Sequence, residues 1–583
     1  MDRRDGDRGG EHLGRRRHGA RRAGGNPAGS GELTDSARYA GSAAGKRDGD
    51  QVVNGRRARA AGSLLAGVAI IGGTLAGPGT AHAATAPAAL GYDTAADGGS
   101  MSMITRIVGA QAMWAKGYTG KGIDVAVIDT GVTRVPGLDK AGKVIDGPDL
   151  SFDSQNAAFA HVDSFGHGTN MASIIAGSDV AVGTTQSCKT CLTGSTYSDT
   201  TKFVGVAPDA RIVNVKAGAS DGATDVSQVI AAIDWVVQHQ HDNGMNIRVV
   251  NLSFGTDSIQ PANIDPLAYA VEVAWRKGIV VVASAGNDGL ATTSLADPAY
   301  DPTILAVGAV DDNDTVPVSD DEVPSFAQHG NATRQVDVVA PGTHVIGLRV
   351  PGSFIDTTVT TGKVGTRFQR GSGTSQAAAV VSGMAALLLQ RYPTATPDQI
   401  KAFLKSHAEP TVSTATVPSA LQPIATIVLK WWEGSGVASV EAATDGGSLP
   451  AATAAPAFGT GLGTLEGARG TYHVVSNGVS LTGERDILST PWDGIRWSAA
   501  AWAGTSWKGG LWNGVRWSGD TWSGARWSTT AWSGSDWAGI RWSGVRWSAM
   551  TWDGARWSGS GWTGVRWSDA AWSGARWSSA SMD

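Results

Sequence analysis

The segment "IDVAVID" at residues 123–129 is a run of apolar, mostly β-branched side chains that ends on the carboxylate of Asp129. Similar runs follow at 211–217 ("RIVNVKA"), 247–253 ("IRVVNLS"), 279–286 ("IVVVASAG") and 303–310 ("TILAVGAV"). Strands that are apolar on every residue, rather than on alternate ones, are typical of a parallel sheet covered on both faces. These runs therefore predict a buried parallel sheet.

Helical patterns separate the predicted strands, as in "VSQVIAAIDWVVQHQ" (226–240) and "PLAYAVEVAWRKG" (266–278). The run "TSQAAAVVSGMAALLLQ" (374–390) is apolar, but Ser and Gly interrupt it, so we expect a buried central helix and not a membrane span. The alternation predicts an α/β fold with a mainly parallel sheet and helices on both of its faces. In open sheets of this kind, ligands bind at the carboxyl ends of the strands.

Three short motifs carry residues for nucleophilic catalysis. Asp129 ends the strand in "AVIDTGV", His167 begins a helix in "SFGHGTNMASIIAG", and Ser375 begins the apolar helix in "GSGTSQAAA". A serine hydroxyl is a poor nucleophile unless a base takes its proton and a carboxylate orients that base. Each motif alone is a weak signal, but the chain order Asp, His, Ser is the order of the subtilisin triad.

On these motifs, residues 105–445 resemble the subtilisin-like serine peptidases, including "APG" at 340–342 and "GSGVASVEAA" at 434–443. The resemblance implies that Asp129 orients His167, that His167 is the general base and then acid, and that Ser375 is the nucleophile. Asn287 of "SAGND" would hold the oxyanion together with the Ser375 backbone N–H. The implied function is a serine endopeptidase that hydrolyses proteins through an acyl-enzyme. The alternative is a catalytically silent scaffold that acts as a cell-surface binding protein.

The family binds its substrate as an added β-strand, which implies a set of substrate contacts here. The segments "SFG" and "DGAT" (221–224) would flank the peptide, and the side chain before the cleaved bond would enter a pocket near "AG" and Ala296. None of these pocket residues is charged, which predicts a weak preference for medium or large apolar side chains. The implied contacts are Ser253, Phe254, Gly255, Ala285, Gly286, Asp221, Gly222, Ala223 and Ala296.

The sequence departs from the family pattern at two places near the triad. Ala379 replaces the usual proline after the nucleophile, and Asn170 replaces the usual histidine after the catalytic histidine. Neither position does chemistry, so we expect altered packing and not a loss of activity.

No cofactor is expected to be required. Cys188 and Cys191 have no further metal ligands nearby, and in an exported protein a disulfide closing a small surface loop is the favoured interpretation. The acidic segment at 311–322 could bind calcium, but a solvated loop explains the same charges. The net charge of −5 gives no indication of a nucleic-acid partner.

The N-terminal region predicts export. Residues 1–60 read as a disordered basic leader, and residues 56–83 as a signal peptide with arginines, a short apolar run and a cleavage site after Ala83. Residues 84–104 would be a short pro-segment or linker, too short for the inhibitory propeptide domain of many family members. We therefore expect a secreted protein, either extracellular or associated with the cell surface.

The C-terminal region follows a linker at 446–469 and a short β-like segment at 470–490. Within 491–583, tryptophan recurs on every fifth residue from Trp492 to Trp577. A period of five fits neither a helix nor a strand, so a β-solenoid and a poorly ordered chain both stay open. We expect a dispensable module, either a stalk or an adhesive segment whose indoles and arginines bind cell-envelope glycan or polymeric substrate.

Overall fold

The computed structural model describes residues 90–156, 158–180, 194–359, 361–411, 432–452, 456–476, 479–508, 511–513, 515–516 and 546–547. The predicted leader, the signal peptide, Cys188, Cys191 and most of the tryptophan repeats lie outside these residues. Those predictions remain predictions.

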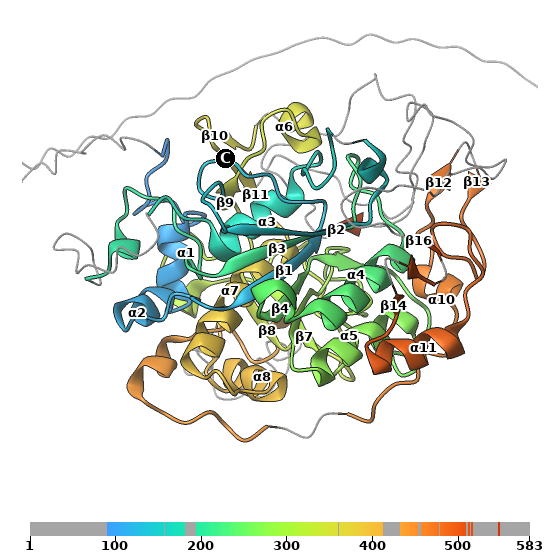
Figure 1. The fold of residues 1–583 in the computed structure, drawn as a ribbon. Helices are drawn as coiled ribbons and strands as arrows, with labels where there is room; N and C mark the ends of the chain where they lie inside the picture. The colour runs from blue at the N-terminus through green and yellow to red at the C-terminus, as the bar shows by residue number, and fades with distance from the viewer. Residues whose placement is uncertain are drawn as a thin grey trace, which may run out of the picture. The chain divides into compact units, whose positions relative to one another are not determined.

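A seven-stranded parallel sheet forms the centre of the fold (Figure 1). Every neighbouring pair of its strands is parallel, and all six residues of β1 are buried. This confirms the parallel sheet that the continuous apolar runs predicted. In spatial order the strands are β2 (Val144–Asp149), β3 (Arg211–Lys216), β1 (Asp124–Asp129), β4 (Ile247–Leu252), β6 (Val280–Ser284), β7 (Leu305–Val310) and β8 (Val338–Pro341).

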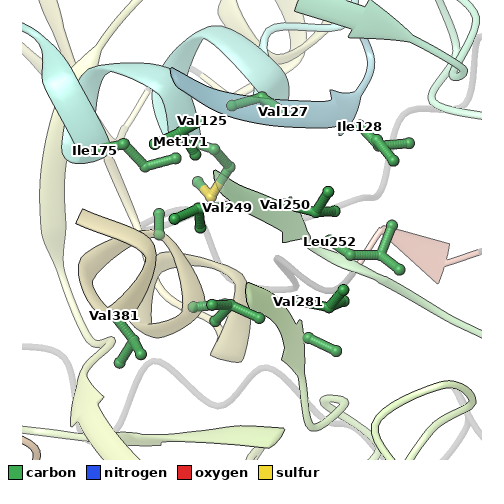
Figure 2. Close-up of a cluster of buried hydrophobic side chains, with 14 of the residues drawn as sticks. Val125, Val127, Ile128, Met171, Ile175, Val249, Val250, Leu252, Val281 and Val381 are labelled. Atoms are coloured by element: carbon green, nitrogen blue, oxygen red, sulfur yellow. The ribbon is translucent and has the colours of Figure 1, made fainter. Parts of the chain in front are cut away.

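Two helix pairs cover the sheet. Helices α3 (His167–Ala176) and α7 (Thr374–Arg391) pack together, and so do α4 (Val226–His239) and α5 (Pro266–Arg276). Figure 2 shows part of the resulting core, where side chains of α3 and α7 lie beside valines of β1 and β4. Helix α7 is fully buried over its first sixteen residues, as its apolar sequence predicted.

The remaining elements are short. Within the described residues, no helix combines the length and the apolar character that crossing a bilayer requires. These elements are α1 (Met101–Ile107), α2 (Ala110–Ala115), α6 (Phe354–Thr358), α8 (Pro397–Ser406), α10 (Leu465–Arg469), α11 (Gly494–Ala503), β5 (Phe254–Gly255), β9 (Val345–Leu348), β10 (Lys363–Val364), β11 (Phe368–Gly371), β12 (Val475–Ser476), β13 (Val479–Ser480), β14 (Trp507–Lys508), β15 (Leu511–Trp512), β16 (Val515–Arg516) and β17 (Arg546–Trp547).

The described segment before the catalytic region belongs to the domain. Leu90 and Tyr92 are buried in the core, and the guanidinium of Arg370 donates to the carboxylate of Asp97 at 2.8 Å. Helix α1 follows, and its N-terminus is capped by the hydroxyl of Ser100. Residues 90–104 are therefore not a free linker, because their apolar side chains complete the core, and the pro-segment stays a prediction.

Residues 456–513, which we call the C-terminal extension, pack against α4 and α5 (Figure 1). The Gly459 N–H donates to the carboxylate of Glu272 at 2.6 Å, and the Phe458 ring lies 4.9 Å from the Tyr269 ring. The linker predicted at 446–469 is therefore wrong from residue 456 onward. Composition alone suggested a linker, but the segment has a partner surface on α5.

The first tryptophans of the ladder are core residues. Trp492, Trp497, Trp507 and Trp512 are buried between the extension and the helices, while Trp502 is 47% exposed. The Trp492 ring lies 4.9 Å from that of Trp497 and 5.9 Å from that of Trp512. This part of the ladder is neither a solenoid nor poorly ordered, since a helix and short strands bring its indoles to one surface.

Asp234 of α4 is the polar centre of this interface. The indole N–H groups of Trp497 and Trp512 both donate to its Oδ2, each at 2.8 Å. Burial raises the pKa of Asp234 to about 6, although these indole donors act to lower it. The folded protein therefore holds a proton on Asp234 between about pH 4 and pH 6 that the unfolded chain has released. Its contribution to stability falls as the pH rises through that window.

We expect Asp234→Asn to stabilise the protein at pH 7 by roughly 2 kcal/mol and to have little effect near pH 4. The amide keeps one oxygen that can accept both indole N–H groups and removes the buried charge. Denaturant unfolding at both pH values measures the difference. The matched control is Asp398→Asn, because half-buried Asp398 accepts one indole N–H, from Trp275 at 2.9 Å. An Asp234→Asn protein that is no more stable than the parent at pH 7 would contradict this account.

Candidate active site

Asp129 and His167 are in direct contact at the carboxyl edge of the sheet. Asp129 is the last residue of β1, and His167 is the first residue of α3. The His167 Nδ1 atom lies 2.8 Å and 3.0 Å from the two oxygens of Asp129, and both side chains are at most 1% exposed. A carboxylate can only accept a hydrogen bond, so Nδ1 carries a proton, and in the neutral imidazole the lone pair is then on Nε2.

The backbone around this pair is tightly packed. A Cβ on Gly168 would lie 2.2 Å from the Gly131 carbonyl oxygen and 3.1 Å from the Cβ of Asp129. Only glycine fits there, so the motif "GHG" brings the helix against the end of β1. The preceding Gly166 has a φ of +106°, which glycine adopts without strain.

Thr130 and Asp163 support the pair, and the sequence analysis did not identify them. The Thr130 N–H donates to Asp129 Oδ1 at 2.7 Å, and its hydroxyl donates to Asp163 Oδ1 at 2.8 Å. Asp163 also accepts the N–H groups of Gly166 at 2.6 Å and Thr169 at 2.7 Å. Asp163 thus fixes the turn that leads into α3. Asp163 lies four residues before His167 in the sequence, but this spacing alone does not indicate that its carboxylate holds the turn.

Asn287 contacts Thr374, the residue directly before Ser375, at the N-terminus of α7. Ser375 is the second residue of that helix, and first-turn N–H groups have no partner within the helix. The Asn287 Oδ1 atom accepts the N–H and the hydroxyl of Thr374, each at 3.0 Å. An N–H can only donate, so this contact fixes the amide orientation and directs the Asn287 NH₂ group away from Thr374.

These four residues come from distant parts of the chain. Asp129 ends β1 and Asn287 follows β6, and the carboxyl ends of parallel strands share one edge. Helices α3 and α7 pack against each other and carry His167 and Ser375 in their first turns. An oriented base, a serine at a helix N-terminus and an amide donor form a set suited to acyl transfer.

The predicted substrate segments lie beside this set. The Ser253 hydroxyl donates to the Ser375 carbonyl oxygen at 3.4 Å, which joins the residue before β5 to the first turn of α7. In this structure β5 pairs antiparallel with β17, with Arg546 opposite Gly255 and Trp547 opposite Phe254. Strand β5 can therefore pair with an added extended segment, as the resemblance implied for a substrate.

The second segment is a tight turn. The Ala223 N–H donates to the Asp221 carboxylate at 3.1 Å. A Cβ on Gly222, which has a φ of +85°, would lie 2.8 Å from the Phe165 ring.

A pocket opens next to Asn287. Gly255, Gly286 and Ala296, which the sequence analysis named for the substrate pocket, are among the residues that line it, whereas Ser253, Phe254 and Ala285 are buried and do not line it. The residues that the sequence analysis named are uncharged, but Asp257 and Asp288 also line this pocket. The full lining is Gly255, Thr256, Asp257, Ser258, Gly286, Asn287, Asp288, Thr292, Ser294, Leu295, Ala296, Gln328 and Tyr472.

The two departures from the family pattern are packing positions. Asn170 is buried in α3 and donates to the Gln369 carbonyl oxygen at 3.4 Å, and a Cβ on Gly347 would lie 2.4 Å from it. Ala379 is buried within α7.

In the segment 311–322, Asp312 and Asp321 are buried, and burial raises their pKa values to about 7 and about 8. Among the described residues no group of three metal-ligating side chains occurs, and calcium binding by this segment stays untested.

Comparison with known proteins adds family information. The subtilase family model (Peptidase_S8) matches residues 120–444. The serine protease AprX of Bacillus subtilis is 35% identical over 49% of this chain and 61% of its own length. Subtilisin DY of Bacillus licheniformis is 30% identical over 52% of this chain and 89% of its own length. A crystal structure of a cold-adapted subtilisin-like serine proteinase aligns at 28% identity over 51% of this chain and 85% of that one, with a TM-score of 0.36.

Proposed function

This chain belongs to the subtilase family of serine endopeptidases, and we propose that it hydrolyses peptide bonds through Asp129, His167 and Ser375. The observation that carries the proposal is the buried contact of 2.8 Å between Asp129 and His167, whose helix packs against the helix that carries Ser375 in its first turn. A buried carboxylate that holds one imidazole nitrogen leaves the other nitrogen as a base. The substrates are proteins or peptides.

The proposed reaction proceeds in two steps. His167 Nε2 takes the proton of the Ser375 hydroxyl as Oγ attacks the carbonyl carbon, and Asp129 stabilises the imidazolium that forms. His167 then gives this proton to the leaving amine, which breaks the peptide bond and leaves an acyl-enzyme. Water attacks the acyl group with His167 again as base, and the released serine recovers its proton. The Ser375 N–H and the Asn287 NH₂ group hold the oxyanion in both steps.

The role of Asn287 has a direct test. We expect Asn287→Ala to lower kcat for a peptide substrate by about a hundred- to a thousand-fold with little change in KM, because the oxyanion forms only in the transition state. Steady-state kinetics on a chromogenic peptide measure both constants. Asn214→Ala is the matched control, because this buried asparagine lies in β3 and donates to Asp146 at 3.0 Å. Equal losses in the two variants would argue against an oxyanion role.

We also propose that the enzyme is exported and retained on a surface by residues 521–583. Trp502 supports the idea, because its half-exposed ring lies 5.0 Å from the Lys277 ammonium and 4.9 Å from the Phe458 ring. The Trp502 indole therefore contacts both a cation and an aromatic ring at the surface of the protein. Twelve further tryptophans at the same spacing follow Asp520. Many weak contacts on one chain give strong retention on cell-envelope glycan or polymeric substrate.

A further inference from the structure

One residue that lines the pocket beside Asn287 comes from far along the sequence. Tyr472 belongs to the C-terminal extension, whereas every other lining residue lies within 255–328. Its side chain is half-buried and packs against the core of the domain. The wall that this residue forms is therefore absent from any protein that contains only the catalytic region.

Two polar contacts fix the backbone next to Tyr472. The Asp257 carboxylate accepts the Thr471 N–H at 2.7 Å and the Thr471 hydroxyl at 2.5 Å. A Cβ on Gly470 would lie 2.2 Å from Asp257 Oδ1, so glycine is needed for this close approach. Asp257 itself lines the pocket. These contacts join the extension to the rim of the pocket, and they hold the backbone beside Tyr472 in place.

A buried ion pair anchors the same segment to the opposite side of the site. The Arg469 guanidinium is 0% exposed and donates to the Asp225 carboxylate at 2.7 Å and to the Gly483 carbonyl oxygen at 2.8 Å. Asp225 caps α4 and directly follows the substrate segment 221–224. The neighbouring Ala468 carbonyl oxygen accepts the hydroxyl of Thr256, another pocket residue, at 2.6 Å. The segment 468–472 thus holds both sides of the substrate cleft.

We propose that Tyr472 determines specificity by forming the outer wall of the pocket for the side chain that precedes the cleaved bond. This proposal rests on the proposed peptidase function. One wall of the pocket is formed by small residues of the catalytic region, Gly255, Gly286 and Ala296, and a Cβ on Gly255 would lie 2.6 Å from the Cβ of Ala296. A flat aromatic side chain can lie between this small-residue wall and the Tyr472 ring, where two rings attract each other beyond simple burial. The preferred substrates carry Phe or Tyr at this position.

The test uses the full chain and three peptides that differ only in the residue before the cleaved bond, which is Phe, Leu or Ala. In Tyr472→Ala, we expect the ratio of kcat/KM for Phe over Ala to fall by about 3- to 10-fold, while kcat/KM for the Ala peptide stays within two-fold. Tyr472→Phe keeps the aromatic ring and should keep the ratio. Tyr472→Leu keeps apolar bulk without the ring and should give an intermediate ratio.

His473→Ala is the matched control, because His473 contacts Glu466 at 2.9 Å and does not line the pocket. It should leave the Phe-to-Ala ratio unchanged. An unchanged ratio in Tyr472→Ala, or an equal fall in His473→Ala, would overturn the proposal. If Tyr472→Ala does not fold, the ratio in Tyr472→Leu decides by the same criterion. A parent protein that cleaves none of the peptides would instead contradict the proposed peptidase function.

Discussion

Ser375→Ala is expected to reduce kcat/KM for peptide hydrolysis at least a thousand-fold, and by on the order of a million-fold if the triad acts as one unit. Without Oγ no acyl-enzyme can form, and the remaining oxyanion donors stabilise only direct attack by water. Folding should be unaffected, because the change removes one atom at the first turn of α7. Steady-state kinetics measure the loss, and far-ultraviolet circular dichroism checks the fold.

The same variant separates the two functions that the sequence left open. A peptidase loses hydrolysis in Ser375→Ala but still binds the peptide, whereas a silent scaffold has no hydrolysis to lose. The matched control is Ser382→Ala, a buried serine on the same helix that donates to Asn251 at 2.9 Å. Its activity should stay within a few-fold of the parent. Hydrolysis that persists in Ser375→Ala would mean that the triad assignment is wrong.

The fold could be predicted because the burial of strands on both faces produces a recognisable sequence pattern, a continuous apolar run. Strands buried on both faces need apolar residues at every position, and β1, β4 and β6 carry such runs in the sequence. The four catalytic residues could be proposed from the sequence because their motifs place polar groups where those strands end or where helices begin. The support from Thr130 and Asp163 was missed, because hydroxyls and carboxylates that fix a turn have no fixed spacing.

The role of the C-terminal extension could not be predicted, because sequence periodicity identifies regular elements but not their partner surfaces. No regular helix or strand has a period of five residues, so the tryptophan spacing did not identify a secondary structure. The sequences of α4 and α5 did not indicate that another segment covers their outer faces. Asp234 illustrates the difficulty. In the sequence Asp234 is a polar residue on an amphipathic helix, whereas in the structure its carboxylate accepts hydrogen bonds from the indole N–H groups of Trp497 and Trp512. The pocket wall at Tyr472 was missed for the same reason.

Truncation should therefore give two different results depending on where the chain ends. A chain that ends after Asp445 loses the whole extension and is expected not to fold. The truncation loses the burial of the four tryptophans of the extension and exposes the apolar surface of α4 and α5 that they cover. The truncation also removes Arg469, the ion-pair partner of Asp225. Soluble yield and thermal unfolding measure this loss, and a stable, active chain ending at Asp445 would contradict it.

A chain that ends after Asp520 keeps these contacts and loses twelve of the repeat tryptophans together with β17. We expect it to fold and to cleave a small peptide at least as fast as the full chain, because β17 no longer pairs with β5. Only the full chain should sediment with isolated cell walls or insoluble polymeric substrate, since the repeats that would bind them lie beyond Asp520. Equal sedimentation of the two chains would exclude retention by residues 521–583. Because both chains fold, that result would not be confused with a loss of structure.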